Sequence, residues 1–304
     1  MQGGEVALAL WQAHHVADRL AEAGFPADLH HIVTKGDRIL DVPLAKIGDK
    51  GLFTHELDQA LLRGDVHLAV HSLKDLPTTL PEGLVLAAIT ERASAGDAFV
   101  AHPSFTGTLD DLPEGAVIAT SSLRRAAQLR AWRPDLRIVD VRGNVGTRLK
   151  KLDASDWHGM VLAVAGLERL AFGDRIRQEI PRGIMLPAVG QGALGIVCAE
   201  ANAAVIELMQ TRLHHAGTAA AALAERAFLR RLEGGCQVPI GASAVVEAGT
   251  LRLEGVVASL DGSVLLREGM HGPVGAPEHL GTSLAEAMIA NGANRVLDAV
   301  RAAS

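Results

Sequence analysis

Short apolar runs rich in β-branched residues alternate with helical patterns along most of this chain, and this alternation restricts the fold more than any other feature. The patterns of helical period predict helices at residues 53–63, 123–132 and 147–152. The apolar runs predict strands at residues 29–33, 66–71, 84–90, 116–120, 137–141 and 160–164. Strands joined by helices form βα units, so we expect an α/β protein with a mostly parallel sheet.

The pattern changes after His215. An alanine-rich helix at residues 216–232 is followed by a Gly-Gly turn, and a last helix is predicted at residues 277–302. Between these helices, alternating runs predict strands at residues 242–247, 251–259 and 263–268. Strands that follow one another before a helix favour a separate small α+β domain. Residues 93–113 are rich in Gly, Pro, Ser and Asp, which is typical of a hinge between two α/β lobes.

Composition excludes several classes of protein. The 304 residues are 48% hydrophobic and 21% charged, as in a folded chain of two or three domains, because a domain has roughly 100–200 residues. No apolar run approaches the roughly 20 residues that span a bilayer, and the opening residues lack the basic region and cleavage site of a secretory signal. Two cysteines, Cys198 and Cys236, are too few for a disulfide framework. We therefore expect a cytoplasmic protein, and the net charge of −6 argues against a general nucleic-acid binder.

A basic segment at residues 120–151 stands out from this acidic background, with nine basic residues against two acidic ones. Thr120-Ser121-Ser122 separates a predicted strand from a predicted helix, where hydroxyl groups cap the helix and its free N–H groups bind anions. Arg124 and Arg125 follow in the first turn, where cations oppose the helix dipole, so a negative group should compensate them. A plain helix cap with two solvated arginines is the alternative.

The next predicted strand repeats this arrangement. It leads into Arg142-Gly143-Asn144 and then into a helix that carries Arg148. The carboxyl ends of neighbouring parallel strands meet at one edge of a sheet. Four arginines would then lie together and bind several carboxylates in bidentate pairs.

Three other segments hold reactive side chains. Asp75 lies just after a buried strand, where ligands collect in open α/β sheets, and it is either a catalytic carboxylate or ordinary turn chemistry before Pro77. Lys46 and Lys50 lie in a Pro- and Gly-flanked segment that is either a mobile loop over a cleft or a plain surface loop. Cys236 lies in a glycine-rich loop, where a thiol is a nucleophile, an attachment point or a free structural cysteine.

Two patterns carry little weight. Gly190 to Gly195 match the dinucleotide pattern G-x-G-x-x-G, but an apolar run rich in strand formers follows instead of a helix, so no nicotinamide site is expected. His67 and His71 are four residues apart on a predicted strand, without the ligand pattern of a metal site. We expect no metal.

Seven segments together resemble the porphobilinogen deaminase family, whose activity is also called hydroxymethylbilane synthase. They follow one another in the family's order and cover nearly the whole chain from Ala9: KGDRILDVPLAKIGDKGLF, AVHSLKDLPTTLPEGL, TSSLRRAAQLR, VRGNVGTRLKKLD, LAVAGLERL, LPAVGQGALGI and ERAFLRRLEGGCQVPIGA. The resemblance implies two α/β domains like type II periplasmic binding proteins and a small C-terminal α+β domain. The implied boundaries are residues 1–92 with 193–211, residues 97–187, and residues 216–304.

The resemblance also implies a reaction. Transferases of this family condense four porphobilinogen molecules head to tail on a covalent dipyrromethane cofactor, with loss of ammonia at each step. Hydrolysis then releases hydroxymethylbilane for tetrapyrrole synthesis, and the product passes to uroporphyrinogen-III synthase. The resemblance implies a monomer, and we expect no nucleic acid and no membrane among its partners.

The family match assigns a role to each candidate residue. Asp75 is expected to be catalytic, and Cys236 is expected to hold the dipyrromethane through a thioether. Asp75 and ten further residues are also expected to bind the cofactor without a covalent bond. The ten are Ser72, Lys74, Thr120, Ser121, Ser122, Arg124, Arg125, Arg142, Gly143 and Asn144. A further group is expected to bind substrate: Lys46, Lys50, Arg148, Arg169 and Gln191. Each pyrrole carries an acetate and a propionate, which paired guanidinium groups suit, and the Asp75 carboxylate can stabilise the cation that forms when ammonia leaves.

The N-terminal segment departs from the family pattern. The family opens with a strand of the form T-R-x-S-x-L-A-L, whereas Gly4 and Val6 stand here in place of the arginine and the serine. Loss of that arginine would remove one carboxylate contact near the cofactor. The alternative function is therefore a homologue that binds tetrapyrrole precursors or other small anions without efficient turnover.

Overall fold

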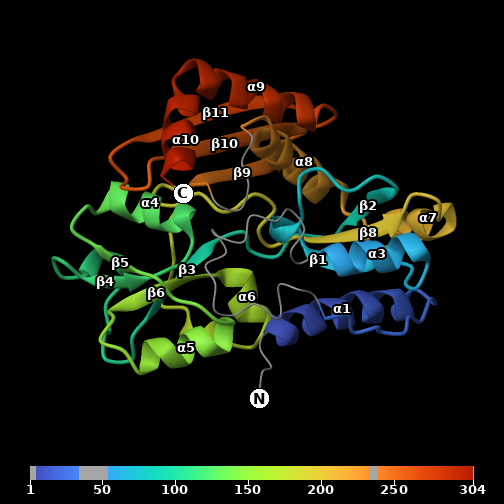
Figure 1. Ribbon diagram of the computed structural model, residues 1–304, viewed down its shortest axis with the longest axis horizontal. Coiled ribbons are helices and arrows are strands. Elements are labelled where there is room, and N and C mark those ends of the chain that lie inside the picture. Colours follow the sequence, from blue (N-terminus) through green and yellow to red (C-terminus); the bar gives the residue numbers. More distant parts are fainter. Residues whose placement is uncertain (1–4, 34–53, 233–237, 304) are drawn as a thin grey trace.

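The computed structural model describes residues 5–33, 54–232 and 238–303. These residues form three sheets with helices packed against them (Figure 1). The order of the strands shows that the chain leaves the first sheet, builds the second, and then returns to the first before it builds the third. Among the described helices, none has the length and apolar character needed to cross a membrane.

The first sheet has the order β1-β8-β2, and both pairs of strands are antiparallel. Its strands are β1 Ala69–Ser72, β2 Leu84–Ile89 and β8 Leu194–Ala199. Helices α1 Glu5–Glu22 and α7 Ala203–Arg212 cover one face, where Val16, Leu20 and Met209 are buried. Helix α3 His55–Arg63 covers the other face through Leu61.

The second sheet has the order β5-β4-β6-β3-β7. The segment β5-β4-β6 is parallel, whereas β3 is antiparallel to both β6 and β7. The strands are β3 Asp97–Ala101, β4 Val117–Ala119, β5 Arg137–Val139, β6 Gly159–Ala163 and β7 Gln178–Glu179. Helix α4 Leu123–Trp132 packs on one face with Phe99 and Leu129 in its core, and α5 Val145–Asp153 and α6 Val164–Arg169 pack on the other.

The third sheet is an antiparallel meander in the order β11-β10-β9. Its strands are β9 Ile240–Glu247, β10 Thr250–Ala258 and β11 Leu265–Pro273. Helices α8 Ala216–Arg231 and α9 Pro277–Ala290 pack on it, with α10 Ala293–Ala302 at the end of the chain. Gly281 of α9 lets these two helices approach closely, because a Cβ there would lie 2.1 Å from the Ala224 carbonyl oxygen. The predicted combination of α/β lobes with a small α+β unit is confirmed.

Three details of the predicted fold are wrong. The first sheet is antiparallel and the second is mixed, because β8 and β3 return against their neighbours. The predicted helix at residues 277–302 is two helices, separated at Gly292, whose φ of +99° ends helical geometry. Residues 29–33 are not a strand and run along the surface. A strand needs a neighbour to accept its hydrogen bonds, and β1, an outer strand of the first sheet, pairs with β8 and with no other described segment.

Candidate active site

The turn after β1 presents Asp75 to solvent. Ser72 ends the strand, and residues Leu73–Asp75 form a single 3₁₀ turn. Leu73 and Leu76 are buried on either side, and the Leu73 N–H donates to the Ala193 carbonyl at 3.0 Å. The two leucines fix the turn in the core of the first sheet while the Asp75 side chain is exposed. Within the described residues, no hydrogen bond occupies its carboxylate.

Protein atoms packed around this turn shift the pKa values of both of its charged groups, although the Asp75 side chain itself is exposed. Desolvation raises the pKa of the Asp75 carboxyl, and the adjacent Lys74 ammonium opposes that rise. Desolvation likewise lowers the pKa of Lys74, although Asp75 acts against it. A carboxylate that water solvates poorly gains more from a cationic partner than one in bulk water. Asp75 is therefore suited to stabilise positive charge on a bound molecule.

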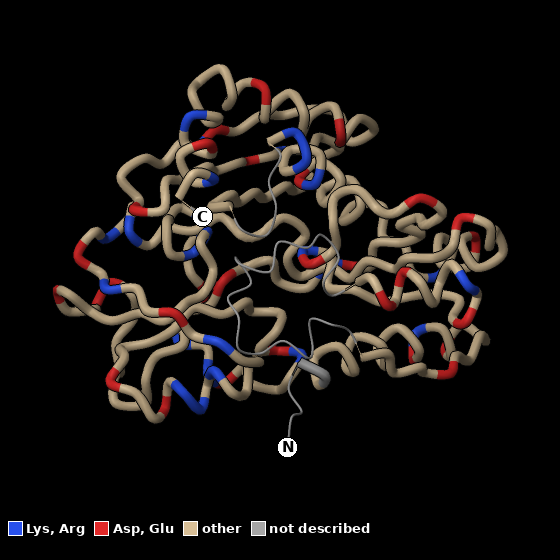
Figure 2. Tube along the Cα trace, in the orientation of Figure 1, with Lys and Arg blue, Asp and Glu red and all other residues tan. Residues whose placement is uncertain are grey.

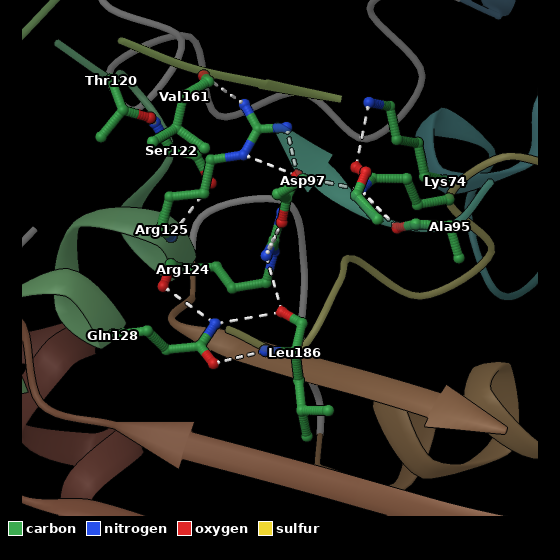
Figure 3. Close-up of polar contacts among 12 residues, drawn as sticks. Lys74, Ala95, Asp97, Thr120, Ser122, Arg124, Arg125, Gln128, Val161 and Leu186 are labelled. Atoms are coloured by element: carbon green, nitrogen blue, oxygen red, sulfur yellow. Dashed lines mark hydrogen bonds and ion pairs between the residues drawn. The ribbon is translucent and has the colours of Figure 1, made fainter. Parts of the chain in front are cut away.

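A chain of hydrogen bonds connects this turn to the second sheet (Figure 3). The Lys74 ammonium lies 3.5 Å from the side-chain oxygen of Gln191, which is 1% exposed. The Gln191 amide nitrogen donates to the Ala95 and Gly96 carbonyl oxygens at 2.8 and 3.1 Å, and to Asp97 at 2.9 Å. Gln191, predicted to bind substrate, is thus fully enclosed and links the two sheets.

Asp97 is a buried carboxylate that binds two arginines (Figure 3). Its Oδ2 accepts from Arg124 Nη1 at 2.7 Å, and its Oδ1 accepts from Arg125 Nε and Nη2 at 3.0 and 2.7 Å. Burial alone would raise the pKa of Asp97, but the two guanidinium groups outweigh it and hold this pKa well below its ordinary value. Asp97 therefore supplies negative charge that was expected to compensate Arg124 and Arg125 in the first turn of α4. One carboxylate leaves one of the two positive charges in excess.

Backbone carbonyl groups hold the same two arginines from the other side. Arg124 Nη1 also donates to Leu186 O at 2.7 Å, and Arg125 Nη1 donates to Val161 O at 3.0 Å. Both side chains are at most 8% exposed. The two guanidinium groups are fixed in place before any ligand binds, and the sequence alone did not indicate Asp97 as their partner.

The ends of β4 and β5 lie side by side, as predicted. Ser122 caps α4 by accepting from the Arg125 N–H, and Asn144 caps α5 by accepting from the Thr147 N–H at 2.8 Å. The Ser121 hydroxyl donates to the Val141 carbonyl, which joins the two strand ends. Gly143 has a φ of +110°, which turns its carbonyl toward Arg148 Nε at 2.5 Å. Basic residues gather along α5 beside this edge (Figure 2).

Two residues of α1 reach the site and were missed by the sequence interpretation. The Gln12 amide nitrogen donates to the Ser72 hydroxyl at 2.7 Å. The Trp11 ring lies 5.3 Å below the guanidinium of Arg169, whose Nη2 donates to the Gly192 carbonyl at 2.7 Å. Residues 5–22 were not predicted to be a helix, so no pattern in the sequence indicated Trp11 or Gln12 as site residues.

The structure brings together most of the predicted site residues. Hydrogen bonds through Gln191 and Asp97 connect the β1 turn to the two arginines of α4, while Arg169 joins the same region at Gly192. Arg142 Nε lies 3.5 Å from Asp140 Oδ2, and both residues follow the end of β5. Three predicted residues lie outside the described residues: Lys46, Lys50 and Cys236. The described part of the chain holds no cluster of side chains suited to a metal ion.

The glycines of the dinucleotide-like pattern have a structural role in the backbone. They lead into strand β8 and not into a helix. Gly192 has a φ of +90°, and a Cβ on it would lie 2.6 Å from the Ala93 carbonyl oxygen. Only glycine allows the two segments that join the first and second sheets to cross so closely.

His71 makes the stability of the fold depend on pH. Its side chain is 8% exposed, its Nε2 has no hydrogen-bond partner in the described structure, and burial lowers its pKa to about 4. The unfolded chain has a histidine pKa near 6.5 and binds the proton first as the pH falls, so stability decreases below that value. We expect His71→Leu to remove about 2 kcal/mol of the loss in unfolding free energy between pH 7 and pH 5.

Urea unfolding at the two pH values measures this difference. His67→Leu is the control, because His67 is exposed on the same segment and its replacement should leave the pH dependence as it is. A His71→Leu protein that loses as much stability as the parent between these pH values would contradict the assignment.

Comparison with known proteins gives a consistent result. The family model described as "Porphobilinogen deaminase, dipyromethane cofactor binding domain" matches residues 4–207, and "Porphobilinogen deaminase, C-terminal domain" matches residues 219–290. The porphobilinogen deaminase of Synechococcus elongatus is 54% identical over 297 residues, which cover 96% of this chain and 92% of that protein. The porphobilinogen deaminase of Desulforudis audaxviator is 52% identical over 303 residues, which cover 99% of this chain and 96% of that protein.

Proposed function

This chain belongs to the porphobilinogen deaminase family, and we propose that the residues around Asp75 carry out the family's reaction. The protein is a transferase that condenses four porphobilinogen molecules head to tail on a covalent dipyrromethane cofactor, with loss of ammonia, and then releases hydroxymethylbilane for tetrapyrrole synthesis. The observation that carries the assignment of the site is the exposed Asp75 carboxylate, which has no hydrogen bond within the described chain and whose neighbour Lys74 is linked through Gln191 to a buried cluster with excess positive charge.

The donor set near Asp75 fits the cofactor. Dipyrromethane supplies the pyrrole carbon to which the first substrate is joined, and its acetate and propionate groups need cationic or N–H partners. Arg124 and Arg125 exceed the charge of Asp97, and the capped N-terminus of α4 adds free N–H groups next to them. Ser72 ends β1 and Lys74 lies in the turn after it, at the other end of the hydrogen-bond chain that runs through Gln191 to Asp97. These residues would hold the carboxylates, and Cys236 would hold the thioether.

Asp75 would act on the substrate. Its carboxylate accepts a hydrogen bond from the pyrrole N–H of an incoming porphobilinogen, which orients the ring. When ammonia leaves, the ring becomes a cation, and the partly desolvated carboxylate stabilises that charge more strongly than water does. Arg169 and the arginines at the β5 end would bind the carboxylates of the units added later.

Finer features of the function follow the family. We propose that the protein works in the cytoplasm as a monomer and passes its product to uroporphyrinogen-III synthase. We also propose the three domains with the boundaries given above, with the site between the first two. Each sheet packs against core residues of its own, which supports this division, and α8 adds Ala219 and Ala222 to the core of the first sheet.

The intact mass of the purified protein tests the proposal. We expect the parent to exceed the mass of its polypeptide by two pyrrole units and to give a colour with Ehrlich's reagent. Cys236→Ser should lose both signals, whereas Cys198→Ala should keep them, because Cys198 is buried in β8. A parent that keeps its bare mass and stays colourless after addition of hydroxymethylbilane would favour the alternative of a protein that only binds small anions.

A further inference from the structure

Helix α8 of the third unit reaches the Asp75 turn through one side chain. The helix lies between the third sheet and the first (Figure 1). Arg226 projects from it and is 5% exposed. Its Nη1 donates to the Leu76 carbonyl at 3.1 Å, and its Nη2 donates to the Pro77 carbonyl at 2.6 Å. These are the carbonyl groups of the two residues that follow Asp75.

The Arg226 guanidinium has no carboxylate partner in the described structure. Burial and, to a smaller extent, the positive charge of the nearby Arg230 lower its pKa to about 10. A buried cation without a counter-charge normally destabilises a fold, because desolvation is not offset by an ion pair. Neutral carbonyl groups compensate it only in part. A side chain with this cost is expected to have a role that an apolar residue could not fill.

The geometry of the two hydrogen bonds indicates that role. A guanidinium is a planar fork that fixes two acceptors relative to one another, whereas an ammonium is a point charge. The fork holds the peptide groups on the C-terminal side of Asp75. On the N-terminal side, the Leu73 N–H is bound to Ala193, and the Leu76 N–H closes the turn onto the Leu73 carbonyl at 3.3 Å. The Asp75 backbone is thus held from both sides.

We propose that Arg226 is a positioning residue that fixes the Asp75 turn from the third unit of the fold, an inference that rests on the proposed role of Asp75. Arg226 touches neither substrate nor the Asp75 carboxylate. It sets where that carboxylate lies relative to a pyrrole ring.

Arg226→Lys separates the fork from the charge. The lysine keeps a cation and most of the buried stem but can hold only one carbonyl well. We expect the variant to carry the Ehrlich-positive cofactor, with kcat lowered at least about tenfold and KM changed less than about threefold, because orientation affects the chemical step more than binding. Arg231→Lys is the matched control, since Arg231 lies on the same helix and pairs only with the exposed Glu286 among the described residues.

Hydrogen exchange gives a second measurement that does not depend on turnover. The amides of residues 73–76 should exchange faster in Arg226→Lys than in the parent, while the rest of the first sheet keeps its protection. Unchanged exchange, or faster exchange with parental kcat, would overturn the proposal. A parent that shows no turnover would instead count against the proposed function, and the exchange result would still decide whether Arg226 holds the turn. Arg226→Ala, if it folds, should show the larger effect on both.

Discussion

Asp75→Asn is expected to lower kcat by about 10²- to 10⁴-fold while the protein keeps its fold and its attached cofactor. The amide has the size of the carboxylate but no charge, so it cannot stabilise the cation that forms when ammonia leaves. The exposed side chain has no hydrogen bond with described residues, so its replacement should leave the turn intact. The rate of hydroxymethylbilane formation, the Ehrlich colour and a thermal melt measure the three quantities.

Asp65→Asn is the control for this variant. Asp65 is an exposed carboxylate that pairs with Arg63 at the end of α3, away from the β1 turn. Its replacement removes the same charge and should leave kcat within about twofold, because exposed ion pairs contribute little. Parental kcat in Asp75→Asn would contradict the catalytic assignment, and a loss of cofactor in that variant would indicate that Asp75 acts in assembly instead.

Glu225→Ala is expected to reduce the free energy of unfolding by about 3–5 kcal/mol. Glu225 is fully buried in α8 and accepts four hydrogen bonds. Arg92 donates two of them, at 2.7 and 3.0 Å, and the Gly190 and Ala244 N–H groups each donate one at 2.8 Å. Removal of the carboxylate leaves two buried amides without a partner and deprives the Arg92 guanidinium of its counter-charge, although Arg92 Nε keeps its bond to the Gln191 carbonyl at 2.7 Å.

Urea unfolding measures this loss against Glu286→Ala. Glu286 pairs with Arg231 on the surface, and its removal should cost less than about 1 kcal/mol. Replacing Arg92 and Glu225 together by leucine and methionine should cost less than Glu225→Ala alone, because no charge then remains unpaired. A Glu225→Ala protein as stable as Glu286→Ala would show that Glu225 does not hold together the three segments that contain Arg92, Gly190 and Ala244.

Local signals in the sequence determined the elements that were predicted well. Helix α4 was predicted at residues 123–132 and spans Leu123–Trp132, because a hydroxyl cap and a helical period define it within one segment. The strand at residues 29–33 was predicted by the same kind of signal and is absent from the described chain, because a strand depends on a neighbour that its own sequence does not specify. The prediction of parallel strands was wrong for the same reason, because the direction of a strand depends on where the chain returns to the sheet.

The same distinction between local and distant signals applies to the residues of the site. The residues that lie in compact motifs, Asp75 and Arg124-Arg125, were predicted as site residues from the sequence and the family resemblance. Their partners were not, because Asp97, Gln12 and Arg226 come from segments far away along the chain. Asp97 could have been suspected, because it opens an apolar run that predicts a buried strand, and a carboxylate there needs a cationic partner. No comparable signal exists for Arg226, whose acceptors are backbone carbonyls.

The place of β8 in the first sheet has a consequence for the order of folding. Strands β1 and β2 do not pair with each other, and each of them pairs with β8, which lies between them. During synthesis, the second sheet can be complete while β1 and β2 still lack a hydrogen-bonded neighbour among the described strands, because β8 emerges after all five strands of that sheet. The nascent chain therefore exposes β1 and β2 until residues 194–199 arrive, and it is in this interval that we expect association with chaperones or with other unfinished chains.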